Sequence, residues 1–324
     1  MLEHMIENID IFACPICRGA LYVCGDLITC VNCRKEYSVD NGIPLFYQTN
    51  GRSHTKNDVT EDVKLFYENN PFPNYEGLES IGDLIEKSHQ GIFARLLDEQ
   101  IPYHIRVLEV GCGTGQLCNF LGISQRVVFG TDMCLNSLRL AEDFRSRHGL
   151  NRVGFYQMNL FRPVFKTESF HLVICHGVLH HTGAPFEGFK SIWNLVKKGG
   201  YIIVGLYNKY GRISTDIRRV LFRIFGLKLK FLDPYLMQDH IGEHIKKTWF
   251  RDQYMHPNES KHTFGEVLRW FGQSGFRFVN SIPHALPFES LRDCFKSIVQ
   301  ANGLIIFLSK PDCYLLGIKT GVSF

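Results

Sequence analysis

The chain of 324 residues lacks several features that would assign it to a special class of protein. It has no run of 18 or more uncharged apolar residues, so no transmembrane helix is expected. Glu3, Glu7 and Asp10 stand where a secretory signal would be basic and then apolar, so we expect a cytoplasmic protein. Internal repeats and low-complexity tracts are missing. The net charge of +4 is too small to indicate a nucleic-acid partner by itself.

What is present is an ordinary globular composition, with 45% hydrophobic and 21% charged residues. At roughly 100–200 residues per domain, the length predicts two domains or one large domain with an attachment. Eleven cysteines stand out. An odd number in a chain without an export signal favours reduced thiols and a metal site over a disulfide framework.

Four of the cysteines form two Cys-x-x-Cys pairs, Cys14–Cys17 and Cys30–Cys33, with twelve residues between the pairs. Each pair stands between short strand candidates. Two such turns can present four thiolates tetrahedrally to one zinc ion, which is a closed, structural arrangement. We therefore predict a zinc ribbon over residues 1–47, with Cys14, Cys17, Cys30 and Cys33 as ligands. The alternatives are plain core thiols and a thioredoxin-like redox motif, although the latter needs only one such pair, at a helix start.

The predicted ribbon is acidic. Residues 1–50 contain three basic and six acidic side chains, a difference of −3, which makes a poor phosphate-binding surface. A structural or docking role is favoured. The polar stretch 48–62 is interpreted as a linker, and a second domain is expected over residues 63–324.

In this second part, strand-like apolar runs alternate with helical patterns, which predicts an α/β fold with a doubly wound, largely parallel sheet. Expected strands are 105–110, 126–131, 154–158, 171–175, 201–205, 275–281 and a final one at 314–320. Expected helices are 82–100, 116–121, 135–148, 186–196 and 263–274. The alternation breaks over residues 209–258, which predicts a cap inserted at 208–260.

The central motif is a glycine-rich turn after the first of these strands, Val107-Leu-Glu-Val-Gly111-Cys-Gly113-Thr-Gly115. Glycines there let the backbone turn sharply and approach a ligand closely. The spacing differs from the Gly-x-Gly-x-x-Gly of dinucleotide folds. Glu109 would repel a diphosphate and attract a cation or an amino group.

Two polar residues follow at the ends of the next strands. Asp132 comes 21 residues after Gly111, where an acid can accept both hydroxyls of a ribose. Asn159 follows the third strand and supplies an amide that could contact an adenine edge.

Together these residues resemble the class I methyltransferases that use S-adenosylmethionine (SAM). The segment Ser169-Phe-His-Leu-Val-Ile-Cys-His-Gly-Val-Leu-His-His-Thr182 resembles the family's FDLV…GVLHH, and Lys197-Lys-Gly-Gly resembles its LKPGG turn. The match covers roughly residues 101–205 and is most similar to the ubiquinone- and menaquinone-type ("type 11") group. It implies a seven-stranded, Rossmann-like sheet.

The resemblance also implies roles for residues. Glu109 and the glycine loop would hold the methionine part of SAM, Asp132 the ribose, Met133 the adenine ring and Asn159 its amino group. The expected cofactor-binding set is Glu109, Gly111, Cys112, Gly113, Gly115, Asp132, Met133, Asn159, Leu160 and His176.

A zinc ribbon joined to this fold resembles a bacterial ribosomal-RNA guanine methyltransferase. It also resembles the zinc-ribbon partner subunit of eukaryotic tRNA, rRNA and release-factor methyltransferases. The segment Glu68-Asn-Asn-Pro-Phe-Pro-Asn-Tyr75 resembles a YEENPYP stretch before some small-molecule or uncharacterised methyltransferase domains.

Methyl transfer needs a general base only if the acceptor loses a proton. Our candidates are His181, which follows the fourth strand, and Asp252, Tyr254 and His256 in the cap. The alternative for each is a packing or helix-capping role.

Residues 209–230 contain seven basic side chains and one acidic one. Ile213, Ile217, Val220, Leu221 and Ile224 recur at helical spacing. We expect a cap helix whose apolar stripe is packed and whose basic residues are solvated. The alternatives are contact with RNA, an anionic substrate or a membrane surface.

The sequence therefore predicts a SAM-dependent methyltransferase with a structural zinc ion, acting on a small molecule by in-line displacement. One alternative is an RNA methyltransferase whose basic cap helix holds phosphates. Another is a non-enzymatic SAM-binding protein that docks a partner through its ribbon.

Overall fold

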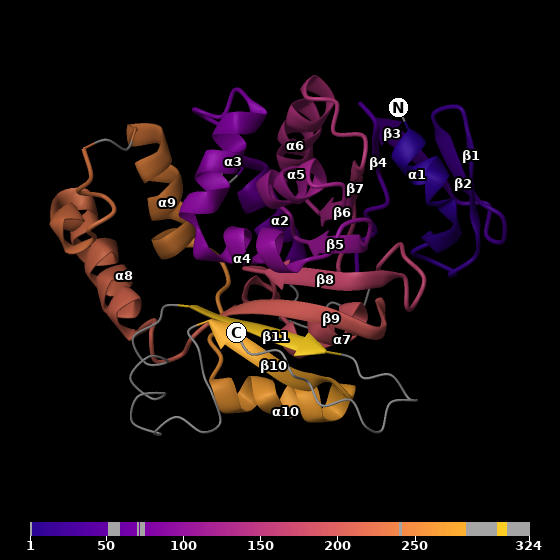
Figure 1. Ribbon diagram of the computed structural model, residues 1–324. Coiled ribbons are helices and arrows are strands. Elements are labelled where there is room, and N and C mark those ends of the chain that lie inside the picture. The colour runs from indigo at the N-terminus through magenta and orange to yellow at the C-terminus, as the bar shows by residue number, and fades with distance from the viewer. Residues whose placement is uncertain are drawn as a thin grey trace.

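The computed structural model describes residues 2–50, 59–69, 71, 75–239, 242–282 and 303–309. Within these residues lie two sheets, one of four strands in the order β1-β2-β3-β4 and one of seven in the order β10-β11-β9-β8-β5-β6-β7. Figure 1 shows the small sheet at one side of the molecule and the large sheet across its middle.

The small sheet belongs to an N-terminal unit with two short helices, α1 (Glu3–Glu7) and η1 (Ile9–Ile11). Its strands are β1 (Leu21–Cys24), β2 (Leu27–Cys30), β3 (Glu36–Asp40) and β4 (Ile43–Pro44). All neighbours are antiparallel. The turn between β3 and β4 is Asn41-Gly42, and both residues have positive φ. A tight two-residue hairpin turn requires this conformation, which Asn and Gly adopt readily.

This unit packs directly against the large sheet. The Phe46 backbone N–H donates to the Gln157 carbonyl at 2.9 Å, and the Phe12 ring lies 5.0 Å from Phe165 and 5.1 Å from Tyr156, centroid to centroid. Its buried residues form one continuous core with those of the sheet. The N-terminal unit is therefore fastened to the edge of the sheet at β7.

The large sheet has five adjacent parallel strands, β9 (Val196–Tyr207), β8 (Phe170–His176), β5 (Arg106–Val110), β6 (Val127–Asp132) and β7 (Val153–Gln157). At the other edge, β11 (Gly303–Ser309) runs antiparallel between β9 and β10 (Arg277–Ile282). Most residues of the central strands are apolar and buried because helices or the N-terminal unit cover both faces. The predicted doubly wound, seven-stranded fold is confirmed.

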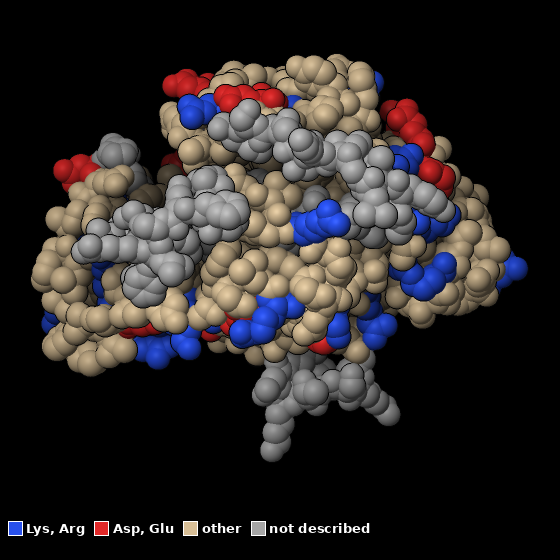
Figure 2. All heavy atoms as spheres, turned by 60° about the horizontal axis from the view of Figure 1, so that its bottom comes forward, with Lys and Arg blue, Asp and Glu red and all other residues tan. Residues whose placement is uncertain are grey.

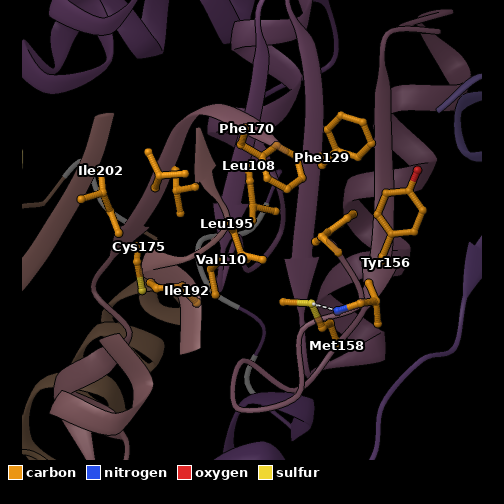
Figure 3. Close-up of a cluster of buried hydrophobic side chains, with 14 of the residues drawn as sticks. Leu108, Val110, Phe129, Tyr156, Met158, Phe170, Cys175, Ile192, Leu195 and Ile202 are labelled. Carbon is orange, nitrogen blue, oxygen red and sulfur yellow. Dashed lines mark hydrogen bonds between the residues drawn. The ribbon is translucent and has the colours of Figure 1, made fainter. Parts of the chain in front are cut away.

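Helices cover the sheet in two layers. On one face lie α3 (Ile81–Gln90), α4 (Ile92–Gln100), α5 (Gln116–Ile123) and α6 (Leu135–Arg147). On the other lie α7 (Pro185–Trp193), α10 (Phe264–Ser274) and the N-terminal unit. Figure 3 shows this second face, where Ile192 and Leu195 approach the strand residues Val110, Cys175 and Ile202.

One expectation was wrong in detail, and one strand was missed. The helix expected over 82–100 is two helices, because Gly91 has extended backbone angles (φ −90°, ψ 124°) and ends α3 as it begins α4. The last strand that the structure describes is β11, which the sequence analysis missed. The strand expected at 314–320 lies outside the described residues.

A short helix before the large domain, α2 (Thr60–Asn69), begins within the expected linker. Its Glu68 carboxylate accepts hydrogen bonds from the backbone N–H groups of Leu135 and Asn136, each at 2.9 Å. An acidic side chain at the N-terminus of α6 stabilises that helix through its dipole. This contact places α2 beside the carboxyl end of β6.

The cap consists of α8 (Ile213–Phe225), η3 (Gly226–Leu232) and α9 (Glu243–Met255), which stand beside the sheet in Figure 1. The expectation of a packed apolar stripe on α8 was wrong. Ile213, Ile217, Val220 and Ile224 are 53%, 57%, 55% and 66% exposed. The buried side chains of α8 are instead Thr215 and Phe222, on the opposite side, because α8 contacts the cap core and α9 through that face. None of the described helices combines the length and apolar character needed to cross a membrane.

Candidate functional site

A cavity of about 930 Å³ lies where the carboxyl ends of β5, β6, β8 and β9 meet. Ligands bind at this edge in open α/β sheets because the connecting loops splay apart there. Its remaining walls come from α2, the α3–α4 junction and α9. The cavity therefore joins the predicted cofactor loop to the cap.

The glycine-rich turn after β5 forms part of the cavity wall. Gly111, Gly113 and Gly115 all have positive φ, at 73°, 54° and 70°. A Cβ at Gly111 would lie 2.2 Å from a Val178 methyl, and one at Gly115 would lie 2.6 Å from the Phe155 ring. Gly115 does not line the cavity; it begins α5 and allows the helix to pack closely.

Glu109 is a buried carboxyl group on β5 that lines the cavity. The Cys118 thiol donates a hydrogen bond to its Oε2 at 2.8 Å. Burial raises the pKa of Glu109 to about 7, against the lowering effect of the Cys118 hydrogen bond. A cation near this carboxyl group would favour its ionised form.

Asp132 ends the neighbouring strand β6. Its Oδ2 accepts from the Gly113 N–H at 2.8 Å and its Oδ1 from the Cys134 N–H at 2.9 Å. A carboxylate has about four acceptor positions, so each oxygen can still accept from a ligand hydroxyl. Burial raises the pKa of Asp132 in spite of these backbone hydrogen bonds. The residue fits the expected ribose contact.

Asn159 follows β7 and also lines the cavity. Its Nδ2 donates to the Gln48 carbonyl and to Asn50 Oδ1, both at 2.8 Å, and its Oδ1 accepts from the Phe161 N–H at 3.0 Å. The amide donors are thus used within the chain. Only Oδ1 can still accept a hydrogen bond from an adenine amino group. The contact between Asn159 and adenine therefore stays a prediction.

The other expected cofactor residues lie around the same cavity, and the structure brings them together. The lining includes Cys112, Met133, Leu160 and His176. The His176 ring stacks on Phe93, which the sequence analysis did not single out, at 5.2 Å between centroids. Burial lowers the pKa of His176, so its imidazole is neutral at pH 7.

His181 is the candidate base whose tautomer the structure defines. Its Nδ1 lies 3.0 Å from the Asn258 carbonyl oxygen. Because a carbonyl oxygen only accepts, Nδ1 carries the hydrogen and Nε2 carries the lone pair. Burial lowers the pKa of His181, so the ring is neutral at pH 7. A neutral imidazole that lines the cavity can accept a proton.

Asp252 lies on α9 and lines the cavity together with Tyr67 of α2. The Tyr67 hydroxyl donates to Asp252 Oδ1 at 3.0 Å, and Gln253 Nε2 donates to Oδ2 at 2.9 Å. Burial and the Asp252 charge raise the pKa of Tyr67, which therefore stays protonated. Sequence reasoning missed Tyr67, although it directly precedes the aromatic- and proline-rich segment Glu68–Tyr75, which was the available signal.

Two candidates lie outside the cavity lining. The His256 ring packs behind His181 at 3.7 Å, and burial lowers its pKa to about 3. Tyr254 donates its hydroxyl to Asp233 at 2.7 Å and packs on Phe222 in the cap core. Neither side chain lines the cavity, so neither is placed to contact a ligand there. Asp252 of α9 does line it.

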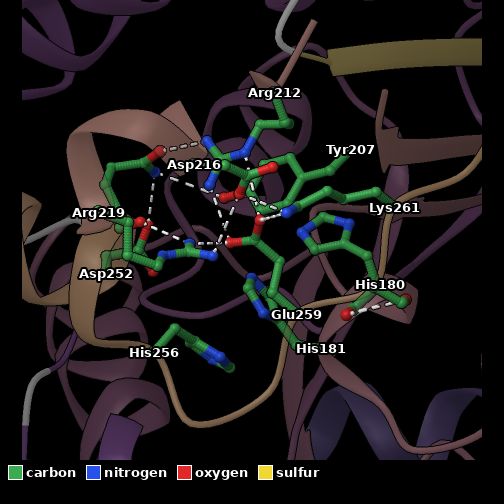
Figure 4. A network of polar contacts seen from close by, with 12 residues as sticks. His180, His181, Tyr207, Arg212, Asp216, Arg219, Asp252, His256, Glu259 and Lys261 are labelled. Atoms are coloured by element: carbon green, nitrogen blue, oxygen red, sulfur yellow. Dashed lines mark hydrogen bonds and ion pairs between the residues drawn. The ribbon is translucent and has the colours of Figure 1, made fainter. Parts of the chain in front are cut away.

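A buried ion network fastens the cap beside these residues (Figure 4). Glu259, with a side chain only 3% exposed, lies 2.8 Å from Arg212 and 2.6 Å from Arg219. Arg212 also donates to Gln253 Oε1 at 2.6 Å and stacks over the Tyr207 ring at 3.9 Å. We call Arg212, Arg219 and Glu259 the cap network. It joins α8, α9 and the end of β9 at the cavity wall.

The four predicted zinc ligands lie together in the N-terminal unit. The Sγ atoms of Cys14, Cys17, Cys30 and Cys33 are all within 4.8 Å of one another, with Cys14–Cys33 at 3.7 Å and Cys17–Cys30 at 3.4 Å. Four thiolates about 2.3 Å from a central zinc would lie about 3.8 Å apart. The Tyr37 hydroxyl lies 3.1 Å from Cys14 Sγ, as a supporting hydrogen-bond partner. The donor set fits a structural zinc ion.

Comparison with known proteins gives a family model described as a methyltransferase domain, which matches residues 103–250. An uncharacterised protein from Synechococcus is 26% identical over 54% of this chain and 48% of its own. A ubiquinone biosynthesis O-methyltransferase from Coxiella burnetii is 23% identical over 54% of this chain and 64% of its own. The chain thus spans about half of the first relative and less than two thirds of the second.

A solved structure of PKMT2 from Rickettsia typhi shares the fold. It has a TM-score of 0.51 and 13% identity, and the match covers 68% of this chain and 52% of that one.

Replacing Glu259 with Gln should destabilise the protein, because the change keeps the side-chain shape but leaves two arginines without their shared carboxylate. Breaking a buried pair in this way costs about 3–5 kcal/mol. Urea denaturation measures the free energy of unfolding. Asp216→Asn is the control, since Asp216 is 38% exposed and its pairs are worth about 1 kcal/mol or less. Equal, small losses in both variants would show that the cap network does not hold the cap.

Proposed function

Residues 103–250 belong to the class I SAM-dependent methyltransferases, and on this premise we propose that the chain transfers the SAM methyl group to a small-molecule acceptor. The observation that carries the proposal is the pair of acidic side chains, Glu109 and Asp132, on adjacent strand tips beside the positive-φ glycine turn. Both line the same cavity as the residues that would meet the acceptor.

The residues present fit SAM. Burial raises the pKa of Glu109, and the SAM amino group would supply a cation that favours the ionised carboxylate. Asp132 has acceptor capacity for two ribose hydroxyls. Met133 and Leu160 supply apolar contacts for adenine. Bound SAM would supply an electrophilic methyl group, and the protein has to align the acceptor with it and exclude water.

On the acceptor side, we assign His181 Nε2 as the group that takes a proton from the acceptor. The Asn258 carbonyl holds the ring in the tautomer that leaves this lone pair free. Asp252 and Tyr67 form a fixed pair that would bind a polar group of the acceptor. The aromatic rings of Tyr67 and Tyr207 lie 6.2 Å and 5.6 Å from the His181 ring, centroid to centroid, and favour a small organic acceptor.

RNA is the less favoured acceptor. Two basic residues of the cap, Arg212 and Arg219, form buried ion pairs with Glu259, so they are not available to bind RNA phosphates. The N-terminal unit is acidic, which also weakens contact with nucleic acid.

Methyl-labelled SAM incubated with fractionated cell extract tests the function. We expect protein-dependent label in the small-molecule fraction. Label in RNA or protein would replace the proposed acceptor class, and no transfer to any fraction, together with tight SAM binding, would favour a SAM-binding protein without activity. An Asp132→Ala variant that cannot hold SAM is the control for contaminating activity.

The raised pKa of Glu109 predicts a pH-dependent affinity for SAM. A bound cation favours the ionised carboxylate, so binding should release a proton below pH 7, and affinity should fall about tenfold or more from pH 7.5 to 5.5. Calorimetry in buffers of different ionisation enthalpy measures both quantities. Glu109→Gln should bind more weakly but with a flat pH dependence over this range. A flat profile in the unmodified protein would contradict the assignment.

Replacing His181 with Gln should lower turnover by about 10²–10⁴-fold, the usual contribution of a general base, and change SAM affinity little. His89→Gln is a matched control with little expected effect on turnover, because His89 lies on α3 outside the cavity lining. Because burial lowers the pKa of His181, the turnover of the unmodified protein should fall with acid only below pH 6.5. Similar losses in the two variants would remove His181 from the proposed role.

We also propose that the N-terminal unit binds one structural zinc ion. Metal analysis should find one zinc per chain, lost in Cys14→Ser/Cys17→Ser together with stability of the unit, since metal binding supplies folding free energy in such small units. Cys24→Ser is the control, because Cys24 lies on β1 outside the four-cysteine cluster. A zinc-free protein of unchanged stability would refute the site.

A further inference from the structure

The outer face of α8 carries an apolar stripe that no described part of the chain covers. Ile213, Ile217, Val220 and Ile224 are all more than half exposed. At 100° per residue these four positions fall within about 60° of the helix circumference. The buried Phe222 lies on the opposite side and packs into the cap core. The stripe therefore faces outward and is not part of the cap core.

The stripe continues beyond the helix. Leu227 and Phe231 lie in η3 and Phe225 ends α8 at the side of the stripe, and all three are more than half exposed. Apolar side chains scattered singly over a surface need no explanation, but a contiguous set of this size marks an interaction site.

Positive charge borders the stripe. Arg223, at the side of the stripe, is exposed, as are Lys228 and Lys230 in η3. The one acidic residue between 209 and 232 is Asp216, and it is paired with Arg219 and Lys261. In Figure 2 the lower edge of the left part of the molecule, where α8 and α9 lie in Figure 1, shows blue side chains with a few red ones among them. An anionic partner would meet no free carboxylate in this segment.

We propose that α8 and η3 dock the protein onto an anionic phospholipid surface. A helix that lies in the membrane interface buries its apolar side among the lipid chains and holds Lys and Arg at the level of the headgroups. The α8 stripe and the cations Arg223, Lys228 and Lys230 supply both parts. This docking is independent of the proposed methyl transfer, since none of these residues lines the cavity.

The chemistry favours lipid over other occupants. A second copy of the chain would bring the same cations against one another, which opposes pairing through this face. RNA would bind the cations through its phosphates but would leave the aliphatic stripe exposed to water. Nucleic acids are bound mainly by cationic side chains and by aromatic side chains that stack on bases. A lipid surface with anionic headgroups satisfies the isoleucine stripe and the flanking cations together.

Vesicle flotation with the whole chain tests the proposal. We expect binding to vesicles of phosphatidylcholine and phosphatidylglycerol at 3:1, weak binding to phosphatidylcholine alone, and weakening by salt. Arg223→Gln/Lys228→Gln/Lys230→Gln should lower the partition coefficient by about fivefold per cation removed. Ile217→Gln/Ile224→Gln should lower it by about tenfold or more.

Matched controls separate docking from general effects. Ile6→Gln/Leu140→Gln replaces two exposed apolar side chains elsewhere, and Lys35→Gln/Lys198→Gln/Arg269→Gln removes three exposed cations elsewhere. Both should bind as the unmodified protein does, with thermal denaturation confirming that every variant folds. As a second measurement, Ile217→Trp should show a blue-shifted emission when anionic vesicles are added.

The proposal is overturned if the chain does not float with anionic vesicles, or if the stripe variants and the control variants bind alike. It is also overturned if light scattering shows a concentration-dependent dimer that Ile217→Gln/Ile224→Gln abolishes, since the stripe would then bind a second copy. Loss of SAM binding would refute the proposed function and leave the vesicle result unchanged, so the two failures can be told apart.

Discussion

Two positions in the turn after β5, Gly111 and Gly115, have no room for a side chain, and the cavity depends on this constraint. A Cβ at Gly111 would lie 2.2 Å from Val178, on the loop after β8, and one at Gly115 would collide with Phe155 on β7. The turn can therefore close only with glycine, and it does so with positive φ. Parallel pairing of β5 with β6 then sets Glu109 opposite Gly130, two residues before Asp132, and both acids line the cavity at this edge of the sheet.

The cap depends on a different interaction. Glu259 lies between Arg212 and Arg219 with little access to water, and Arg212 also reaches Gln253 and the Tyr207 ring. Buried ion pairs add little net stability compared with apolar packing, but they define one arrangement because an unpaired buried charge is costly. Here that arrangement holds α9 with Asp252 toward the cavity, while the neighbouring Asn258 carbonyl orients His181.

The sequence alone predicted the parallel strands and the clustering of Cys14, Cys17, Cys30 and Cys33, because each rests on a local pattern with one structural solution. The zinc ion and the SAM contacts stay predictions. The position of Tyr67 could not be predicted, since its contact with Asp252 spans 185 residues. The α8 stripe was assigned to the wrong environment because periodicity gives the apolar side of a helix but not what lies against it. Gly91 was overlooked as a helix break because glycine within a helical pattern is often tolerated.

The most direct test of the central claim, that the edge between β5 and β6 binds SAM for methyl transfer, is a crystal structure with S-adenosylhomocysteine. The account predicts ribose hydroxyls that donate to Asp132, an amino group beside Glu109, and the sulfur facing the part of the cavity lined by His181 and Asp252. Density for the ligand elsewhere, or a ribose turned away from Asp132, would contradict it.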